Sequence, residues 1–274
     1  MFIQTSIIGS TSKMNKFKTV WLSDIHLGYK DCKAEYLLNF LENSDIETLY
    51  LVGDIVDMWA MSSQFLWPAA HNQVLHKLIL LSEQGTRIIY LPGNHDEPIQ
   101  KYDGMYFGKI EIHREYIHQT LDGRKLLVLH GDQFDDDVCF GKLHAWLGDK
   151  AYDFLLFLNR WYNYIRNKLG YPYWSLAGHI KSKIKGAHVA IDRYRKAALN
   201  RVIELKLDGV VCGHIHHPEI TKVGDLTYFN DGDWIENCSA LTEDMQGNIS
   251  ITYWTSTISE NTKLSLIENN QKAA

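Results

Sequence analysis

The sequence is poor in cysteine and has no long apolar run. Its four cysteines, Cys32, Cys139, Cys212 and Cys238, form no C-x-x-C pair, which argues against a zinc knuckle or a disulfide framework. No window approaches the ~18 apolar residues of a membrane span, and residues 1–12 have neither a basic n-region nor a small-residue cleavage site. We therefore expect a cytoplasmic protein whose residues 1–17 form a disordered extension.

Negative charge is scarce in one segment. Between Cys139 and Arg201 there are 12 Lys and Arg against 3 Asp and Glu, a formal charge of +9; because the whole chain carries -5, the other residues carry -14. Apolar residues of this basic segment recur at helical spacing. We expect residues 139–205 to form a helical cap on a core made of residues 18–138 and 206–257, followed by a loose tail at 258–274.

The first third of the chain alternates between strand and helix patterns. Residues 18–22, 48–52 and 87–91 are short apolar runs rich in β-branched and aromatic residues, whereas residues 33–42 and 72–84 carry leucines at helical spacing. This order predicts parallel strands joined by right-handed helical crossovers.

A second set of strand patterns follows. Residues 111–119 and 125–129 flank an Asp122-Gly123 turn typical of a hairpin, and further strands are predicted at 209–212, 226–229 and 249–254. We assign these to a second sheet. The sequence therefore predicts an α/β fold, a two-sheet sandwich flanked by helices, with the helical cap as an insertion.

Five polar clusters stand where predicted strands end, which is where ligands bind in open α/β sheets. They are Asp24-Ile25-His26, Gly53-Asp54, Gly93-Asn94-His95-Asp96, His130-Gly131-Asp132 and Gly213-His214-Ile215-His216. Each alone is weak, because a single His or a post-strand Asp usually has a structural role. Together they offer imidazoles, carboxylates and an amide oxygen, which suit Mn²⁺, Zn²⁺ or Fe²⁺. Asp54 is the natural shared ligand of two ions, because Gly53 lets the backbone come close.

In this order, the motifs D-x-H, G-D, G-N-H-D, H and G-H-x-H resemble those of the calcineurin-like metallophosphoesterase superfamily. The resemblance spans residues 21–216 and implies two divalent ions that activate water and neutralise the phosphoryl oxygens during hydrolysis of a phosphorus-oxygen bond. It implies one ion held by Asp24, His26, Asp54 and His216, and a second held by Asp54, Asn94, His130 and His214.

The resemblance also makes His95 the catalytic histidine, which would stabilise or protonate the leaving oxygen. We expect Asp96 to orient His95, and Asp57 to act similarly near the bridging ligand. A turn carboxylate and a helix cap are equally ordinary interpretations of these two residues.

Longer segments narrow the resemblance. Residues 51–59 (LVGDIVDMW), residues 230–236 (NDGDWIE) and the helical insertion resemble the UDP-2,3-diacylglucosamine pyrophosphatases of lipid A synthesis. This implies Mn²⁺, a helical lid, and cleavage of the lipid-linked nucleotide sugar to UMP and 2,3-diacylglucosamine 1-phosphate. The best known members have Arg at the position of His95, so another phosphodiesterase or phosphatase activity stays open. An inactive scaffold is disfavoured, because every expected ligand position is filled.

The insertion suggests how such a substrate would be held. Trp174 lies near Lys181, Lys183 and Lys185 in the sequence, and cations beside aromatic groups suit a substrate with phosphates and acyl chains. Alternatively, the aromatic residues pack the cap and the lysines form a solvated face. A basic, aromatic-rich surface could also rest peripherally on the inner membrane. Nucleic acid is disfavoured as a partner, because the aromatic residues follow helical core spacing.

Overall fold

The computed structural model describes residues 14–135, 155–156, 158–159, 161–166, 168–169, 171, 173–181 and 185–255. The expectations for residues 1–13, for the tail at 258–274 and for Lys183 fall outside these residues. Within the described part of the chain, no helix is long and apolar enough to cross a membrane.

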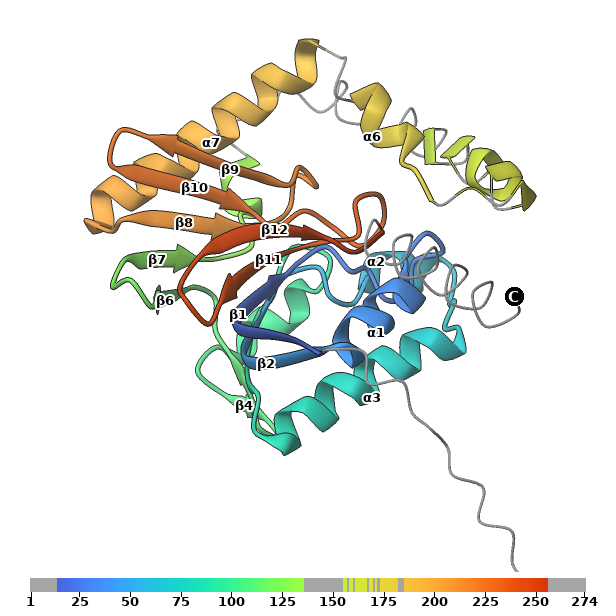
Figure 1. Cartoon of the computed structure of the whole chain (residues 1–274), viewed down its shortest axis with the longest axis horizontal. Coiled ribbons are helices and arrows are strands. Elements are labelled where there is room, and N and C mark those ends of the chain that lie inside the picture. Colours follow the sequence, from blue (N-terminus) through green and yellow to red (C-terminus); the bar gives the residue numbers. More distant parts are fainter. Residues whose placement is uncertain are drawn as a thin grey trace, which may run out of the picture.

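Seven strands form the larger sheet, in the order β12-β11-β1-β2-β3-β5-β4 (Figure 1). They are β1 (Asn15–Leu22), β2 (Ser44–Val52), β3 (Arg87–Leu91), β4 (Tyr106–Phe107), β5 (Ile110–Ile112), β11 (Ser239–Asp244) and β12 (Ile249–Tyr253). β1, β2 and β3 pair in parallel, which confirms the predicted unit. β1 starts at Asn15, so residues 15–17, which we expected in the disordered extension, pair with β2 instead.

Five strands form the smaller sheet, in the order β6-β7-β8-β10-β9. They are β6 (Tyr116–Gln119), β7 (Lys125–Val128), β8 (Gly209–Cys212), β9 (Glu219–Val223) and β10 (Leu226–Asn230). Trp21 and Tyr50 of the larger sheet meet Val128, Val211 and Phe229 of the smaller one in a shared buried cluster. The predicted two-sheet sandwich is confirmed.

Two strand predictions were wrong in detail. Residues 111–119, predicted as one strand, divide between β5 of the larger sheet and β6 of the smaller sheet. The chain leaves the larger sheet after the His113 backbone N–H bonds Tyr90 O, and Arg114 N then bonds the Asp103 carboxylate. Residues 249–254, assigned to the second sheet, form β12 beside β11 in the larger sheet.

The helices among the described residues are α1 (Ala34–Glu42), α2 (Met58–Ser63), α3 (Ala69–Gln84), α6 (Leu176–Lys181) and α7 (Lys185–Leu205), with 3-10 turns η1 (Glu97–Tyr102) and η2 (Asp132–Phe134). In Figure 1, α1 and α3 lie against the larger sheet and α7 against the smaller one, whereas α6 lies in the insertion, away from both sheets. Phe40 of α1 and Leu78 of α3 belong to the buried cluster on the larger sheet. Tyr194 and Val202 of α7 pack on the smaller sheet. The part of α7 that carries these two residues therefore belongs to the core, whereas we expected the cap to extend to residue 205.

Candidate metal centre

The loops that follow the strands have an unusual backbone. Asp24, His26, Asp54, His214 and His216 all have φ between 50° and 68°. Left-handed backbone at a residue other than glycine costs about 1–3 kcal/mol and persists only where the surroundings impose it. All five are residues that the sequence predicts as metal ligands, so the strain is concentrated where their side chains converge.

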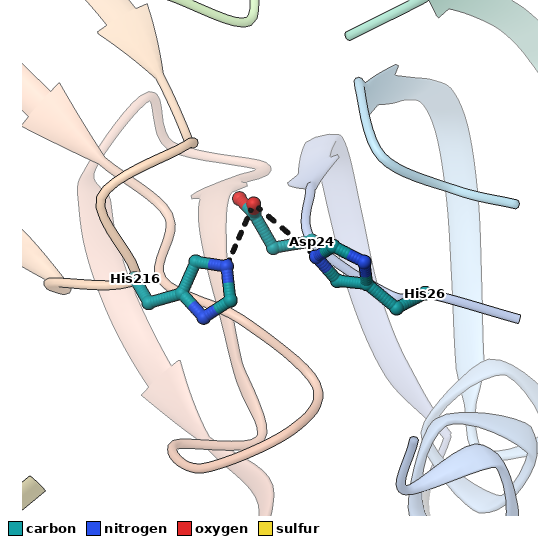
Figure 2. A group of neighbouring side chains, drawn as sticks. All are labelled: Asp24, His26 and His216. Atoms are coloured by element: carbon teal, nitrogen blue, oxygen red, sulfur yellow. Dashed lines mark ion pairs between the residues drawn. The ribbon is translucent and has the colours of Figure 1, made fainter. Parts of the chain in front are cut away.

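Asp24, His26 and His216 form one group of possible ligands (Figure 2). His216 Nε2 lies 3.0 Å from Asp24 Oδ1, and His26 Nε2 lies 3.8 Å from the same oxygen. The other oxygen, Asp24 Oδ2, accepts hydrogen bonds from Ser23 Oγ at 2.5 Å and from the His214 backbone N at 2.9 Å. These bonds fix the carboxylate so that Oδ1 faces the two imidazoles.

Asp54, His130 and His214 form a second group, whose ligand atoms lie within 4.8 Å of one another. His130 Nε2 is 3.3 Å from Asp54 Oδ2, while His130 Nδ1 lies 2.8 Å from the Val52 carbonyl. A proton on Nδ1 satisfies that carbonyl and leaves Nε2 free to bind a metal. His26 Nε2 is also 3.8 Å from Asp54 Oδ2, so Asp54 lies between the groups, where a shared ligand would be needed.

Two glycines make this approach possible. A Cβ at Gly53, where φ is +83°, would overlap the His130 ring, and a Cβ at Gly93 would overlap both Asp54 Oδ1 and the His130 ring. The close approach that the sequence predicts for Gly53 is therefore present, and Gly93 adds a second one.

Several buried polar atoms at the centre have no hydrogen-bond partner. Among the described residues these include Asp24 Oδ1, His26 Nε2, Asn94 Oδ1 and His130 Nε2. An unsatisfied buried polar atom costs about 1–3 kcal/mol. All four atoms belong to residues predicted as ligands, and divalent cations would satisfy them. The donor set of imidazoles, carboxylates and an amide oxygen thus fits two divalent metal ions.

His95 lies at the edge of the centre, where its ring contacts Asp57, Trp59 and the His26 ring, whose centroid is 4.6 Å away. His95 Nδ1 lies 3.0 Å from Asp57 Oδ1, and its Nε2 lies 3.9 Å from Asp54 Oδ2. The Trp59 ring packs on it at a centroid distance of 4.4 Å. Asp57 Oδ2 contacts His26 Nδ1 at 3.0 Å, while Asp57 Oδ1 also caps α2 through Ala60 N. Asp57 therefore caps α2 and also contacts the two histidine rings, so the two interpretations of this residue do not exclude each other.

Asp96 does not contact the His95 ring, contrary to our expectation. It is fully buried and accepts hydrogen bonds from the backbone N–H groups of Gly93 and Ile55, and from the Tyr90 hydroxyl. Its carboxylate points at the backbone because these donors, from two loops, converge on it. Asp96 therefore ties the Gly93 loop to the Asp54 loop, and Asp57 takes the contact with the ring.

Burial and charge act against each other at the centre. Burial alone would raise the pKa of Asp54, but the positive charges of His130 and His26 lower it to about 2. Burial would lower the pKa of His26, but the nearby carboxylates of Asp24, Asp57 and Asp54 raise it to about 10. The carboxylates therefore attract positive charge into a buried site, whether as protons or as metal ions.

Asp135 is a site residue that sequence reasoning missed. Its Oδ1 lies 2.7 Å from His214 Nε2, which leaves Nδ1 as the ring nitrogen of His214 free to bind a metal. Asp135 follows His130-Gly131-Asp132 at a spacing that belongs to none of the motifs considered, so only the folded chain reveals the contact.

The predicted substrate contacts in the insertion are placed only in part. Trp174 packs on Tyr162 and His179, with ring centroids 5.7 and 5.2 Å apart, which agrees with a packing role inside the insertion. Lys181 ends α6 and Lys185 begins α7. The insertion approaches the centre elsewhere, because Leu156 packs with Tyr29 and Ile235, and the Tyr29 ring lies 6.4 Å from that of His26.

Comparisons with known proteins agree with this centre. Residues 17–218 match the calcineurin-like phosphoesterase family. A UDP-2,3-diacylglucosamine hydrolase of Aliivibrio fischeri is 24% identical over 81% of this chain and 92% of its own length. The enzyme of the same name from Yersinia pseudotuberculosis is 26% identical over 75% of this chain and 84% of its own.

Among solved structures, the phosphoesterase Yfce of E. coli is similar with a TM-score of 0.42, at 16% identity over 86% of this chain and 98% of that one. The family match covers most of the residues that build both sheets and every predicted ligand of the centre. The chain therefore belongs to the calcineurin-like phosphoesterase family and is a metal-dependent hydrolase.

Proposed function

We propose that this enzyme hydrolyses the pyrophosphate of UDP-2,3-diacylglucosamine, giving UMP and 2,3-diacylglucosamine 1-phosphate in lipid A synthesis. The observation that carries the proposal is the likeness to curated hydrolases of this substrate over 81% and 75% of the chain. That likeness covers 92% and 84% of the two hydrolases' own lengths, so it is not confined to the short metal-binding motifs.

The centre supports the chemistry. Asp24, His26, Asp54 and His216 would hold one ion, and Asp54, Asn94, His130 and His214 the other. Two divalent ions, with Mn²⁺ the proposed native metal, supply Lewis-acid activation of water and neutralisation of phosphoryl charge when bound. The chain supplies His95, whose ring is fixed by Asp57 at Nδ1 and presents Nε2 towards Asp54. From there Nε2 would donate a hydrogen bond or a proton to the leaving oxygen.

His95→Ala tests this role. We expect turnover to fall by about 10²–10⁴-fold, the usual contribution of a general acid or base, while bound metal stays nearly unchanged because His95 is not a predicted ligand. Steady-state kinetics together with elemental analysis of the purified variant would measure both. A variant with full activity would remove the role.

The substrate is tested by offering two phosphoesters to the purified enzyme with Mn²⁺. We expect release of UMP from UDP-2,3-diacylglucosamine, followed by chromatography, with weaker action on bis-p-nitrophenyl phosphate. The alternative is a phosphodiesterase or phosphatase that acts on another substrate. The observation in its favour is that His95 occupies the position at which the best known pyrophosphatases have Arg. Robust hydrolysis of bis-p-nitrophenyl phosphate alone would select that alternative.

We also propose that the enzyme is cytoplasmic and contacts the inner membrane peripherally through its insertion. The side chains of Trp161, Tyr164 and Tyr171 are each more than half exposed. Arg166 lies over the ring of Tyr171, and Lys168 lies over that of Tyr164. Exposed aromatic rings next to cations suit an anionic bilayer surface. Failure to sediment with anionic vesicles at low ionic strength would end this proposal.

A further inference from the structure

An apolar cleft lies on the outer face of the larger sheet, behind the metal centre. Its volume is about 570 Å³, and its walls come from α3, η1 and β4. It exists because β3 is followed by the short 3-10 turn η1 instead of a full helix. Within the described part of the chain, the sheet face beyond α3 therefore has no crossover helix over it.

The walls of the cleft are almost entirely hydrocarbon. Among the described residues, its lining consists of Leu, Ile, Val and Met side chains with three tyrosines and one phenylalanine, and includes no charged residue. One of the tyrosine hydroxyls, that of Tyr90, already donates to Asp96. A polar ligand would lose its hydration here without compensation, whereas an apolar one would not. The volume falls within the range of ligand pockets, roughly 300–1,000 Å³.

The mouth of the cleft exposes large apolar side chains. Phe107 is 69% exposed, Tyr106 67% and Ile79 41%. Apolar surface gathered in this way marks an interaction site rather than ordinary surface. A flat protein partner would cover this rim and leave the interior of the cleft empty, whereas a flexible alkyl chain can enter the cleft.

The cleft and the metal centre share a wall. Ile55 and Tyr90 line the cleft, and both bond the Asp96 carboxylate, Ile55 through its backbone N–H and Tyr90 through its hydroxyl. Asp54, a predicted ligand of both ions, directly precedes Ile55. An occupant of the cleft would therefore lie directly behind the loops that hold the centre.

We infer that this cleft binds a linear acyl chain of a lipid. The inference rests on the proposed function in one respect, because a diacylated substrate is what would bring such a chain to this enzyme. The cleft lies within the core fold, between α3 and the edge strand β4, and so is separate from the insertion that the sequence marks as the lid.

The test uses cis-parinaric acid, a fluorescent linear fatty acid, with the full chain in detergent-free buffer. Ile79→Glu places a charge at the mouth of the cleft, and Ile203→Glu, at a 60% exposed position of α7 outside the cleft, is the matched control. We expect the wild type and Ile203→Glu to bind the probe alike, and Ile79→Glu to bind it at least about tenfold more weakly. Phe107→Glu, at a still more exposed position of the mouth, should repeat the loss.

Several outcomes would overturn the inference. They are absence of probe binding by the wild type, equal binding by all the variants, and a wild-type dimer in light scattering that Ile79→Glu converts to a monomer, which would assign the cleft to a second copy. Vesicle binding lost in Ile79→Glu without any binding of the free probe would assign the cleft to a bilayer surface instead.

The proposed function is tested separately, by assaying release of UMP. If the protein hydrolyses UDP-2,3-diacylglucosamine but does not bind the probe, only the inference that the cleft binds an acyl chain is overturned. Probe binding that depends on Ile79, in a chain that never releases UMP, would support the cleft and overturn the proposed substrate.

Discussion

Asp57 contacts two histidine rings with one carboxylate, His26 through Oδ2 and His95 through Oδ1. Burial would raise the pKa of Asp57, but the bonds from these two rings hold it well below its ordinary value. Asp57→Asn keeps the size of the side chain and an oxygen that can cap α2, yet its NH₂ group cannot accept a bond from a ring N–H. We expect metal affinity to fall about 10–100-fold, as is usual when a partner of a ligating histidine is removed, and turnover to fall with it.

Titration of the metal-free Asp57→Asn variant with Mn²⁺, followed calorimetrically, measures the loss. Asp57→Ala is the comparison, because it removes the helix cap as well and should also lower helical content by circular dichroism. Unchanged Mn²⁺ affinity in Asp57→Asn would reduce Asp57 to a helix cap.

Asp135 contacts the centre through the 2.7 Å bond from its Oδ1 to His214 Nε2. Its side chain is 56% exposed, so Asp135→Ala should leave the fold intact. Without this partner the His214 ring can rotate and change tautomer, and we expect one of the two Mn²⁺ equivalents to bind about 10–100-fold more weakly. Asp225→Ala, in the exposed turn between β9 and β10, is the control. Two unchanged equivalents in the calorimetric titration would show that Asp135 does not orient the ligand.

At the scale of the elements, the loop after β3 has to pass close to the loop after β2. Gly93 allows this, because a Cβ there would overlap Asp54 and His130. We expect Gly93→Ala to weaken Mn²⁺ binding at least about tenfold by displacing a ligand. Gly85→Ala is the control that separates steric overlap from backbone strain. Gly85 has a φ of +110°, but a Cβ there would meet no other atom. The substitution should therefore lower the unfolding free energy by about 1–2 kcal/mol and leave Mn²⁺ binding unchanged. Equal metal binding in both variants would contradict the steric argument.

The same scale shows what a sequence can predict. The clusters at strand ends were identifiable because parallel strands bring their carboxyl ends to one edge, so chain order alone placed Asp24, Asp54 and Asn94 together. The division of residues 111–119 was not, because no glycine or proline separates the two strands and nothing in the sequence marks the change of sheet. The contacts of Asp57 and Asp96 were not either. Asp57 precedes His95 by 38 residues and Asp96 directly follows it, and only the folded backbone shows that Asp57 is the carboxylate that reaches the ring.

At the scale of the whole molecule, metal loading should be coupled to protons and to stability. In the metal-free chain the pKa of His26 is raised from 6.5 to about 10 by Asp24, Asp57 and Asp54, against the effect of burial, and the pKa of His130 is also raised. A raised histidine pKa stabilises the fold fully below the unfolded value of 6.5, and that stability is lost as pH rises through the folded value. The metal-free protein should therefore become less stable across this window.

Bound metal removes this loss, because a ligating imidazole must be neutral and metal uptake expels the protons held by the centre. Asp54, with a pKa of about 2, is ionised throughout the window and does not contribute to the slope. We expect the difference in unfolding free energy between the Mn²⁺-loaded and chelator-treated protein to widen between about pH 7 and pH 9. Urea unfolding of both forms measures it, and calorimetry in buffers of different ionisation enthalpy counts the protons released. A difference that stays constant with pH, with no proton release on loading, would mean that the histidines of the metal-free centre are already neutral.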